Sequence, residues 1–231
     1  MKKLIKIDII SDVVCPWCYV GEHRLQQALD KKQPEFAAAI HFYPFELNPD
    51  MPEEGVNHLE YLADKFGSKS RVHAVHHQLE TLAQSEGLPL NFDLIQKSPN
   101  TFKAHRLIWL AAQYKVQRQV AVALYLAYFA EGKNVGDENE LIHIGTIAGI
   151  PQEKLTAFFS GTEGEKEVHN MEKEIYQSGI SSVPAFIIDD KYLVRGAQPV
   201  ETFCEALEKA AADGLEINAV AGESCDENSC L

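Results

Sequence analysis

Several features are scarce or absent in this sequence, and each absence argues against a class of protein. Five cysteines in 231 residues are too few for a disulfide-stabilised scaffold, which favours a reducing compartment. Lysine and arginine number 21 against 34 aspartates and glutamates, and the net charge of −13 argues against partners such as nucleic acid or an anionic membrane. No apolar run approaches the roughly 18 residues of a membrane-spanning helix. The 45% hydrophobic content is nevertheless enough for a full core.

The N-terminus also lacks the pattern of a secretory signal peptide. Lysines stand at its start, but Lys6 and Asp8 interrupt the apolar stretch, and no small-residue cleavage site follows. The cysteines cluster at positions 15 and 18, at 204, and at 225 and 230, which is unlike a disulfide framework. We therefore expect a cytoplasmic protein.

What the sequence does contain is a Cys-x-x-Cys motif at the junction of two predicted elements. The apolar run from Leu4 to Ile10 predicts a buried strand, and a helical pattern begins after Cys15. A thiolate is favoured at a helix N-terminus, because the first N–H groups have no intrahelical partner and the helix dipole attracts negative charge. Pro16 suits the first helical position, and Cys18 lies on the same helix face as Cys15, within bonding reach.

This setting predicts a dithiol/disulfide redox centre. The alternative for any Cys-x-x-Cys is half of a structural zinc site, which would need two further Cys or His ligands. A strand before the motif, a helix after it and a proline between the cysteines favour the redox interpretation. We expect no metal.

The periodicity along the chain predicts four parts. Residues 1–50 form a βαβ unit with parallel strands, in which Pro44 indicates that the second strand, at about 40–45, is ending or lies at an edge. The other three predicted parts are an all-helical insertion at 51–162, an α-β-β-α segment at 163–213, and a flexible tail at 214–231.

Turn and strand signals predict the elements of residues 163–213. Ala185–Ile188 predicts a short buried strand, Asp189-Asp190 the turn of a hairpin, and Tyr192–Arg195 the returning strand. A final helix is predicted at Val200–Ala212. The fold class is therefore α/β, with a βαβ unit and a ββα unit that flank a large helical insertion.

This order of elements, with Cys-x-x-Cys opening the first helix, resembles the thioredoxin fold with an insertion. The chain is similar to the DsbA-like thioredoxin family, in its FrnE-type branch, which is related to the 2-hydroxychromene-2-carboxylate isomerases and the kappa-class glutathione transferases. The resemblance covers about residues 4–212. It is carried by Asp12, Cys15–Cys18, Phe45–Pro49, Asn100, Ala104–Arg106 and Val183–Pro184.

The resemblance implies roles for several residues. Cys15 is the exposed nucleophile, and Cys18 resolves the mixed disulfide. Pro184 follows a cis peptide bond and faces the disulfide, while Val183 offers its backbone groups to a bound substrate strand. Pro16 and Trp17 lie between the cysteines as substrate-contacting residues, although simple packing is the alternative for Trp17.

Asp12 precedes the first cysteine by three residues. A carboxylate at this place could accept the proton of Cys18 when that thiol has to become a nucleophile. The plainer alternative is a helix N-cap or turn residue. The sequence leaves both interpretations open.

Other side chains with reactive groups have plainer interpretations. His73 and His76–His77 share a predicted helix, but without a matching acid or cysteine we expect a solvated helix face and not a metal site. His105–Arg106 border the active site if the resemblance holds, with a structural role as the alternative. Cys204 falls in the last helix and is predicted to be an inert buried thiol.

Cys225 and Cys230 stand in the polar, acidic tail. Members of the FrnE-type branch include chains with a second, C-terminal Cys-x4-Cys, so the resemblance implies an electron shuttle that exchanges with the Cys15–Cys18 pair. The alternatives are an incidental chain end and metal capture by soft thiolates.

We therefore predict a thiol–disulfide oxidoreductase or isomerase that acts on protein disulfides, in the context of oxidative stress. It needs no cofactor besides its redox-active disulfide. Its expected partners are disulfide-bonded or thiol proteins and a cellular thiol reductant, for which glutathione is a candidate. Two alternatives remain: a glutathione-dependent transferase or isomerase of small molecules on the same fold, and a redox-switched chaperone.

Overall fold

A four-stranded mixed sheet carries the Cys-x-x-Cys motif in the computed structural model, which describes residues 3–32 and 36–212. The strand order is β2-β1-β5-β6. β1 (Lys3–Ser11) pairs in parallel with β2 (Phe36–Pro44) and antiparallel with β5 (Ala185–Ile188), which forms a hairpin with β6 (Tyr192–Arg195). The strand that leads into the motif is therefore a central one.

The helices occur in the predicted order. α1 (Pro16–Lys32) connects the two parallel strands, α8 (Glu165–Gln177) precedes the hairpin, and α9 (Val200–Ala212) follows it. Between β2 and α8 the chain forms, in order, β3 (Val56–Asn57), α2 (His58–Phe66), α3 (Lys69–Ser85), a 3-10 turn η1 (Phe92–Leu94), β4 (Lys97–Ser98), α4 (Phe102–Gln113), α5 (Gln117–Tyr125), a π-helical turn η2 (Leu126–Ala130), α6 (Glu138–Ile147) and α7 (Gln152–Phe159).

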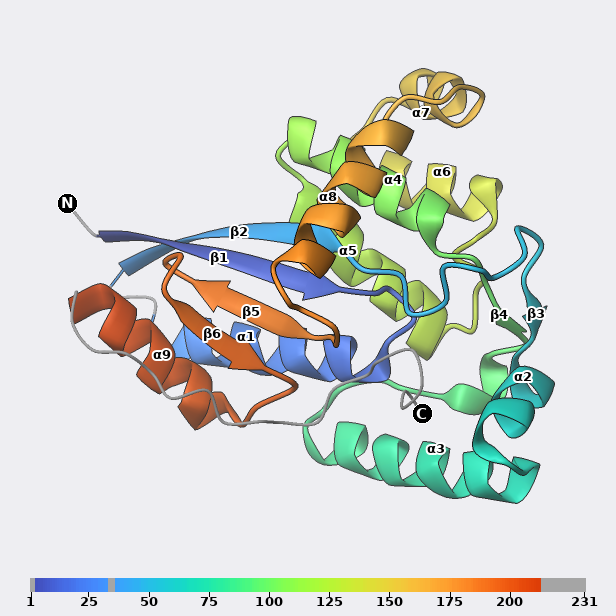
Figure 1. Ribbon diagram of the computed structural model, residues 1–231, viewed down its shortest axis with the longest axis horizontal. Helices are drawn as coiled ribbons and strands as arrows, with labels where there is room; N and C mark the ends of the chain where they lie inside the picture. The colour runs from blue at the N-terminus through green and yellow to red at the C-terminus, as the bar shows by residue number, and fades with distance from the viewer. Residues whose placement is uncertain (1–2, 33–35, 213–231) are drawn as a thin grey trace.

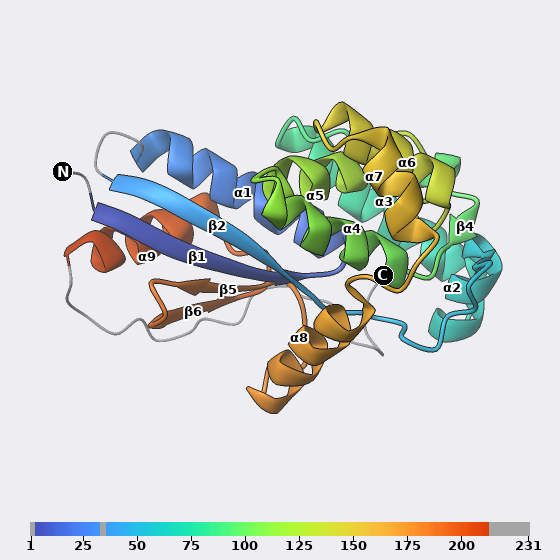
Figure 2. The same cartoon turned by 90° about the horizontal axis from the view of Figure 1, so that it is seen from above.

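The sheet lies between two layers of helix. α1 and α9 pack together on one face, and α8 crosses the other face beside β2 (Figures 1 and 2). The inserted helices form a block at the end of the sheet where β1 runs into α1 (Figure 1). The Cys-x-x-Cys motif therefore lies where the sheet meets the insertion.

The expected α/β thioredoxin fold with a helical insertion is confirmed, with small differences. The insertion also contains the short antiparallel pair of β3 and β4. β2 begins at Phe36 and not at about residue 40, because pairing with β1 keeps the alanines at 37–39 extended although alanine has little strand propensity. It ends at Pro44 and lies at an edge, as a proline in a strand predicts.

Local signals in the sequence located the strands well. Ile5, Ile7, Ile9 and Ile10 are almost completely buried, because β1 is covered on both faces of the sheet. The hairpin turn lies at Asp189–Asp190, where both residues have positive φ, 56° and 58°, as a tight turn between twisted strands requires.

One expectation in the insertion was wrong. His76 does not lie on a solvated helix face with His73 and His77: its side chain is 7% exposed and stacks on Phe92 with ring centroids 3.9 Å apart. The reason is tertiary, because η1 folds back against α3 and covers this position.

Two further expectations concern membrane-spanning helices and the cysteines of the tail. In the part that the structure describes, no helix is long and apolar enough to cross a membrane. Cys225 and Cys230 lie outside the described residues.

Candidate active site at the start of α1

Cys15 lies at the junction between β1 and α1, as the sequence predicts. β1 ends at Ser11, the Cys15 N–H donates to the Asp12 carbonyl across 3.2 Å, and α1 begins at Pro16. The Cys18 N–H points at Cys15 Sγ across 3.3 Å. A backbone donor from the first helical turn is thus directed at the sulfur, which is the arrangement that favours a thiolate.

A proline loop forms the opposite wall of the site. The Val183–Pro184 peptide bond is cis, and the Val183 carbonyl oxygen lies 3.9 Å from Cys15 Sγ. Gly21 permits this approach, because a Cβ there would lie 3.2 Å from the Pro184 ring and 3.0 Å from Phe186. The fold therefore brings the two motifs together although Cys15 and Val183 are 168 residues apart in the sequence.

Cys18 is held as a thiol. Burial raises the pKa of Cys18 well above its usual value, and the neighbouring Cys15 and the charge of Asp12 add to this. Cys18 is a free thiol with 1% of its surface exposed. Such a thiol needs a base close by before it can act as a nucleophile.

Asp12 is the candidate for that base, and its carboxylate is fully buried. Its Oδ2 accepts the Leu47 N–H at 2.8 Å, and its Oδ1 accepts the Val14 N–H at 3.4 Å. The bond to Val14 is what the turn interpretation predicts. The charge of Asp12 also acts on Cys18, which a proton acceptor requires. One side chain can therefore serve both roles.

The expected exposure of Cys15 was wrong. Its side chain has 0% of its surface exposed, because Sγ is enclosed between the start of α1 and Val183. Pro16 is also buried, and Trp17 is half-buried and packs against the core. A substrate disulfide can therefore reach Sγ only after this part of the surface opens.

A small cavity adjoins the motif on the side of the insertion, with a volume of about 50 Å³. This holds a few water molecules or one small group. His58 and His76 line it, and burial lowers the pKa of His58 to about 4 and that of His76 to about 3, so both are neutral at pH 7. The other lining residues are Val14, Pro16, Leu47, Asn48, Tyr61, Leu62, Lys65, Phe92, Ser98, Pro99, Tyr128 and Phe129.

Three more titratable side chains gather around Asp12. His105 on α4, Glu46 after β2 and Glu172 on α8 are 2%, 5% and 9% exposed. Burial raises the pKa of Glu46 to about 8 and also raises that of Glu172. Burial lowers the pKa of His105, but the contact with Asp12 and the charges of Glu172 and Glu46 outweigh it and raise the pKa overall.

Sequence reasoning placed His105 near the site and assigned no chemistry to Glu46 or Glu172. A signal existed for His105, since His105 and Arg106 are polar residues directly before the apolar run that begins at Leu107 in α4. Glu46 and Glu172 look like surface glutamates in the sequence. Their burial follows only from the packing of α8 beside β2.

Glu46 makes the stability of the fold depend on pH. Its pKa is about 8 in the folded chain against 4.5 as the ordinary value. The folded state therefore binds this proton more tightly, and stability falls as pH rises from about 5 to 8, by up to about 1.4 kcal/mol per pH unit. We expect Glu46→Gln, which cannot ionise, to gain stability relative to the wild type over this range. Urea unfolding at pH 5, 6.5 and 8 measures the gap, and a gap that does not widen with pH contradicts the assignment.

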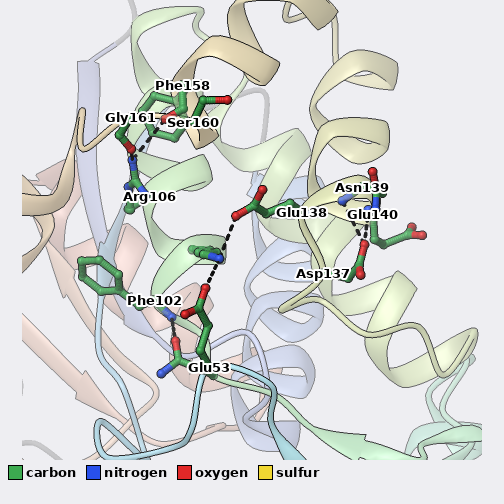
Figure 3. A network of polar contacts seen from close by, with 12 residues as sticks. Glu53, Phe102, Arg106, Asp137, Glu138, Asn139, Glu140, Phe158, Ser160 and Gly161 are labelled. Carbon is green, nitrogen blue, oxygen red and sulfur yellow. Dashed lines mark hydrogen bonds and ion pairs between the residues drawn. The ribbon is translucent and has the colours of Figure 1, made fainter.

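Arg106, the neighbour of His105, serves a structural role. Its guanidinium donates to the carbonyl oxygens of Phe158, Gly161 and Glu163 at 3.3, 2.7 and 2.8 Å and lies over the Phe158 ring. Figure 3 shows Arg106 beside Phe158 and Gly161. These contacts hold the connection between α7 and α8. Of the pair His105–Arg106, only His105 faces Asp12.

Other candidates for chemistry lie apart from this site. Among the described residues, no group of three or more His, Cys, Asp or Glu side chains is placed to hold a metal ion. Cys204 is a half-buried free thiol on α9, and burial raises its pKa.

Known proteins resemble this chain over almost its whole length. The family described as DSBA-like thioredoxin domain matches residues 6–208. A structure titled probable DsbA oxidoreductase from Streptomyces coelicolor is 30% identical, with 98% of each chain covered and a TM-score of 0.83.

Two other known proteins are similar at lower sequence identity. The uncharacterized protein YwbO of Bacillus subtilis is 25% identical over 210 residues, which is 90% of this chain and 96% of that protein. A 2-hydroxychromene-2-carboxylate isomerase structure is 16% identical, covers 90% of this chain and 98% of its own, and has a TM-score of 0.67, which shows a shared fold.

Proposed function

Because this chain belongs to the DSBA-like thioredoxin domain family, a family of thiol–disulfide oxidoreductases, we propose that it exchanges disulfides with protein substrates through Cys15 and Cys18. The observation that carries the proposal is the placement of Cys15 Sγ. The sulfur lies between the Cys18 N–H at 3.3 Å and the Val183 carbonyl at 3.9 Å, beside the cis bond to Pro184. A nucleophile, a resolving thiol and a backbone edge for an extended peptide thus meet at one place.

In the first half of the reaction, the Cys15 thiolate attacks one sulfur of a substrate disulfide. A bond forms between Cys15 Sγ and that sulfur, and the other substrate sulfur leaves with the electron pair as a thiolate. The backbone of the loop at Val183 pairs with the substrate backbone, and the cavity beside Pro16 takes a small substrate side chain.

In the second half, Asp12 takes the proton from the Cys18 thiol. The Cys18 thiolate then attacks Cys15 Sγ, the internal disulfide forms, and the second substrate sulfur leaves as a thiolate. The substrate has gained two electrons, and the pair has lost them. A cellular thiol, for which glutathione is a candidate, reduces the internal disulfide and closes the cycle.

The setting of this reaction also belongs to the proposal. The sequence supports a reducing cytoplasm, where repair of disulfides formed under oxidative stress is the useful direction. Cys225 and Cys230 are proposed to relay electrons between the pair and its partners.

Replacement of the nucleophile tests the proposal. Cys15→Ser is expected to reduce insulin reduction and the refolding of scrambled ribonuclease to the uncatalysed rate, because serine cannot form the mixed disulfide. Cys204→Ser is the matched control, since it removes a half-buried thiol on α9 and should leave turnover unchanged. Turnover retained by the Cys15 variant would refute the mechanism. In the same assay, a chain ending at Ala212 tests the proposed relay by Cys225 and Cys230. Unchanged turnover would show that these two cysteines do not take part.

A further inference from the structure

The outer edge of β2 is closed by a side chain at Phe42. The Phe42 N–H donates to Oε1 of Gln117 across 3.0 Å, and Nε2 of Gln117 donates to the Phe42 carbonyl across 3.1 Å. Gln117 is the first residue of α5, which packs against β2. One side chain thus takes the place of a neighbouring strand at this position.

The same edge is open earlier in the strand, at Ala38 and Ile40. Successive residues of a strand direct their N–H and C=O groups to opposite sides, so Ala38, Ile40 and Phe42 share one direction. Apart from the pairing with β1, neither Ala38 nor Ile40 makes a hydrogen bond among the described residues. In both views the first half of β2 extends away from the inserted helices (Figures 1 and 2). The sheet therefore ends here in unpaired backbone groups.

The sequence of this segment does not protect the open edge. Edge strands in natural proteins usually carry a lysine, a proline or a bulge that prevents pairing with another chain. Phe36–Ile40 reads Phe-Ala-Ala-Ala-Ile and pairs with β1 in unbroken register. Ala37 and Ala38 are exposed, and Leu4, the register partner of Ala37, is 63% exposed. The edge thus offers backbone donors and acceptors between small apolar side chains.

The charges at this end of the sheet favour a second copy of the chain as the occupant. The lysines of β1 and of the end of α1 are each paired with a carboxylate: Lys3 with Asp189, Lys6 with Asp8 and Asp190, Lys31 with Glu201, and Lys32 with Glu208. These pairs make the region around the open edge nearly neutral, although the chain has a net charge of −13. Two copies that repel each other through the rest of their surfaces can therefore approach through this one.

We propose that β2 pairs antiparallel with β2 of a second copy of this chain, about a two-fold axis at Ala38. Phe36 then lies opposite the partner's Ile40, and Ala38 lies opposite the partner's Ala38. Opposed residues whose backbone groups face each other exchange two hydrogen bonds, so the three pairs form about six. Pairing stops where Gln117 occupies the edge at Phe42. Because the symmetric pair uses both copies of the edge, association ends at a dimer.

Sedimentation velocity of the full chain in reducing buffer measures the association. The paired segment is far smaller than a standard interface, so the dimer is expected to be weak and concentrations up to about 500 µM are needed. Ala38→Pro removes the outward N–H and leaves the pairing with β1 intact, because an edge strand tolerates proline where its N–H faces solvent. We expect it to weaken the dimer about tenfold or more. Ala38→Ser keeps the N–H and is the matched control, with unchanged association.

Charge replacement at the same position tests the two-fold register. Ala38→Lys and Ala38→Glu each place like charges opposite each other in the symmetric pair, and each is expected to weaken association. An equal mixture of the two variants should associate more strongly than either one alone, because opposite charges then meet across the axis. This rescue occurs only where residue 38 of one copy lies beside residue 38 of the other, and it does not depend on how well the proline variant folds.

A full chain that stays monomeric up to about 500 µM refutes the proposal, as does a dimer that neither Ala38→Pro nor the charge variants weaken. Amide exchange followed by NMR identifies a different occupant. Slow exchange at Ala38 and Ile40 in a monomer would place another segment of this chain on the edge and would also refute the proposal. Disulfide exchange should be the same in all Ala38 variants, since the register partner of Ala38 is Ile5, near the start of β1, whereas Cys15 follows its end. The proposed function and the proposed dimer are therefore tested separately.

Discussion

A chain that carries Cys18→Ser is expected to accumulate a mixed disulfide between Cys15 and its substrate. Cys15 can still attack, but the thiol that resolves the mixed disulfide is gone, because it is Cys18 whose N–H lies 3.3 Å from Cys15 Sγ at the first turn of α1. The variant is made in a chain that ends at Ala212, so that the tail cysteines cannot take its place. Steady-state turnover should fall to the uncatalysed rate while nearly one equivalent of protein becomes covalently bound. Non-reducing electrophoresis and intact mass after reaction with an oxidised protein substrate measure the adduct.

The contrast with Cys15→Ser makes this result specific. The Cys15 variant should form no adduct, because the remaining Cys18 thiol is buried and held protonated. The double variant Cys18→Ser/Cys204→Ser should trap substrate as Cys18→Ser does, which excludes the half-buried thiol on α9. An adduct in the Cys15 variant would show that Cys18 attacks the substrate. Turnover retained by the Cys18 variant would show that Cys18 is not needed to release the substrate.

The largest effect on stability is expected from Arg106→Met. The guanidinium is 2% exposed and satisfies the carbonyl oxygens of Phe158, Gly161 and Glu163, and it forms an ion pair with Glu165 at 3.4 Å. Methionine fills part of the space but removes the guanidinium donor from the Gly161 and Glu163 carbonyls and leaves only the Gly161 N–H on the Phe158 carbonyl, so we expect a loss of about 3–5 kcal/mol. Urea or thermal unfolding measures it.

Arg71→Met is the matched control, because Arg71 is exposed on α3 and its replacement should change stability by less than about 0.5 kcal/mol. The folded Arg106 variant should keep its redox activity, since Arg106 faces the α7–α8 connection and not the cysteines. A loss of turnover without a loss of stability would instead place Arg106 in the active site.

Local patterns in the sequence predicted much of the fold and the position of the Cys-x-x-Cys motif. The apolar run of β1, the proline at the start of α1 and the adjacent aspartates at the hairpin turn each specify backbone geometry within a few residues. For the same reason the Cys-x-x-Cys motif could be placed at a helix N-terminus. These features are decided by neighbours in the chain, so they are readable before any tertiary structure exists.

The environment of that motif was decided by tertiary structure. Burial of Cys15, the approach of Val183 allowed by Gly21, and the gathering of His105, Glu46 and Glu172 around Asp12 all join segments that are distant in the sequence. A glutamate in a helix pattern looks the same whether solvent or another helix covers it. Its proton affinity depends on which of these occurs, because burial and neighbouring charges act through space and not along the chain. The sequence by itself located the Cys15–Cys18 pair at the start of a helix, and the packing of α4 and α8 against the sheet decided which charged groups surround it.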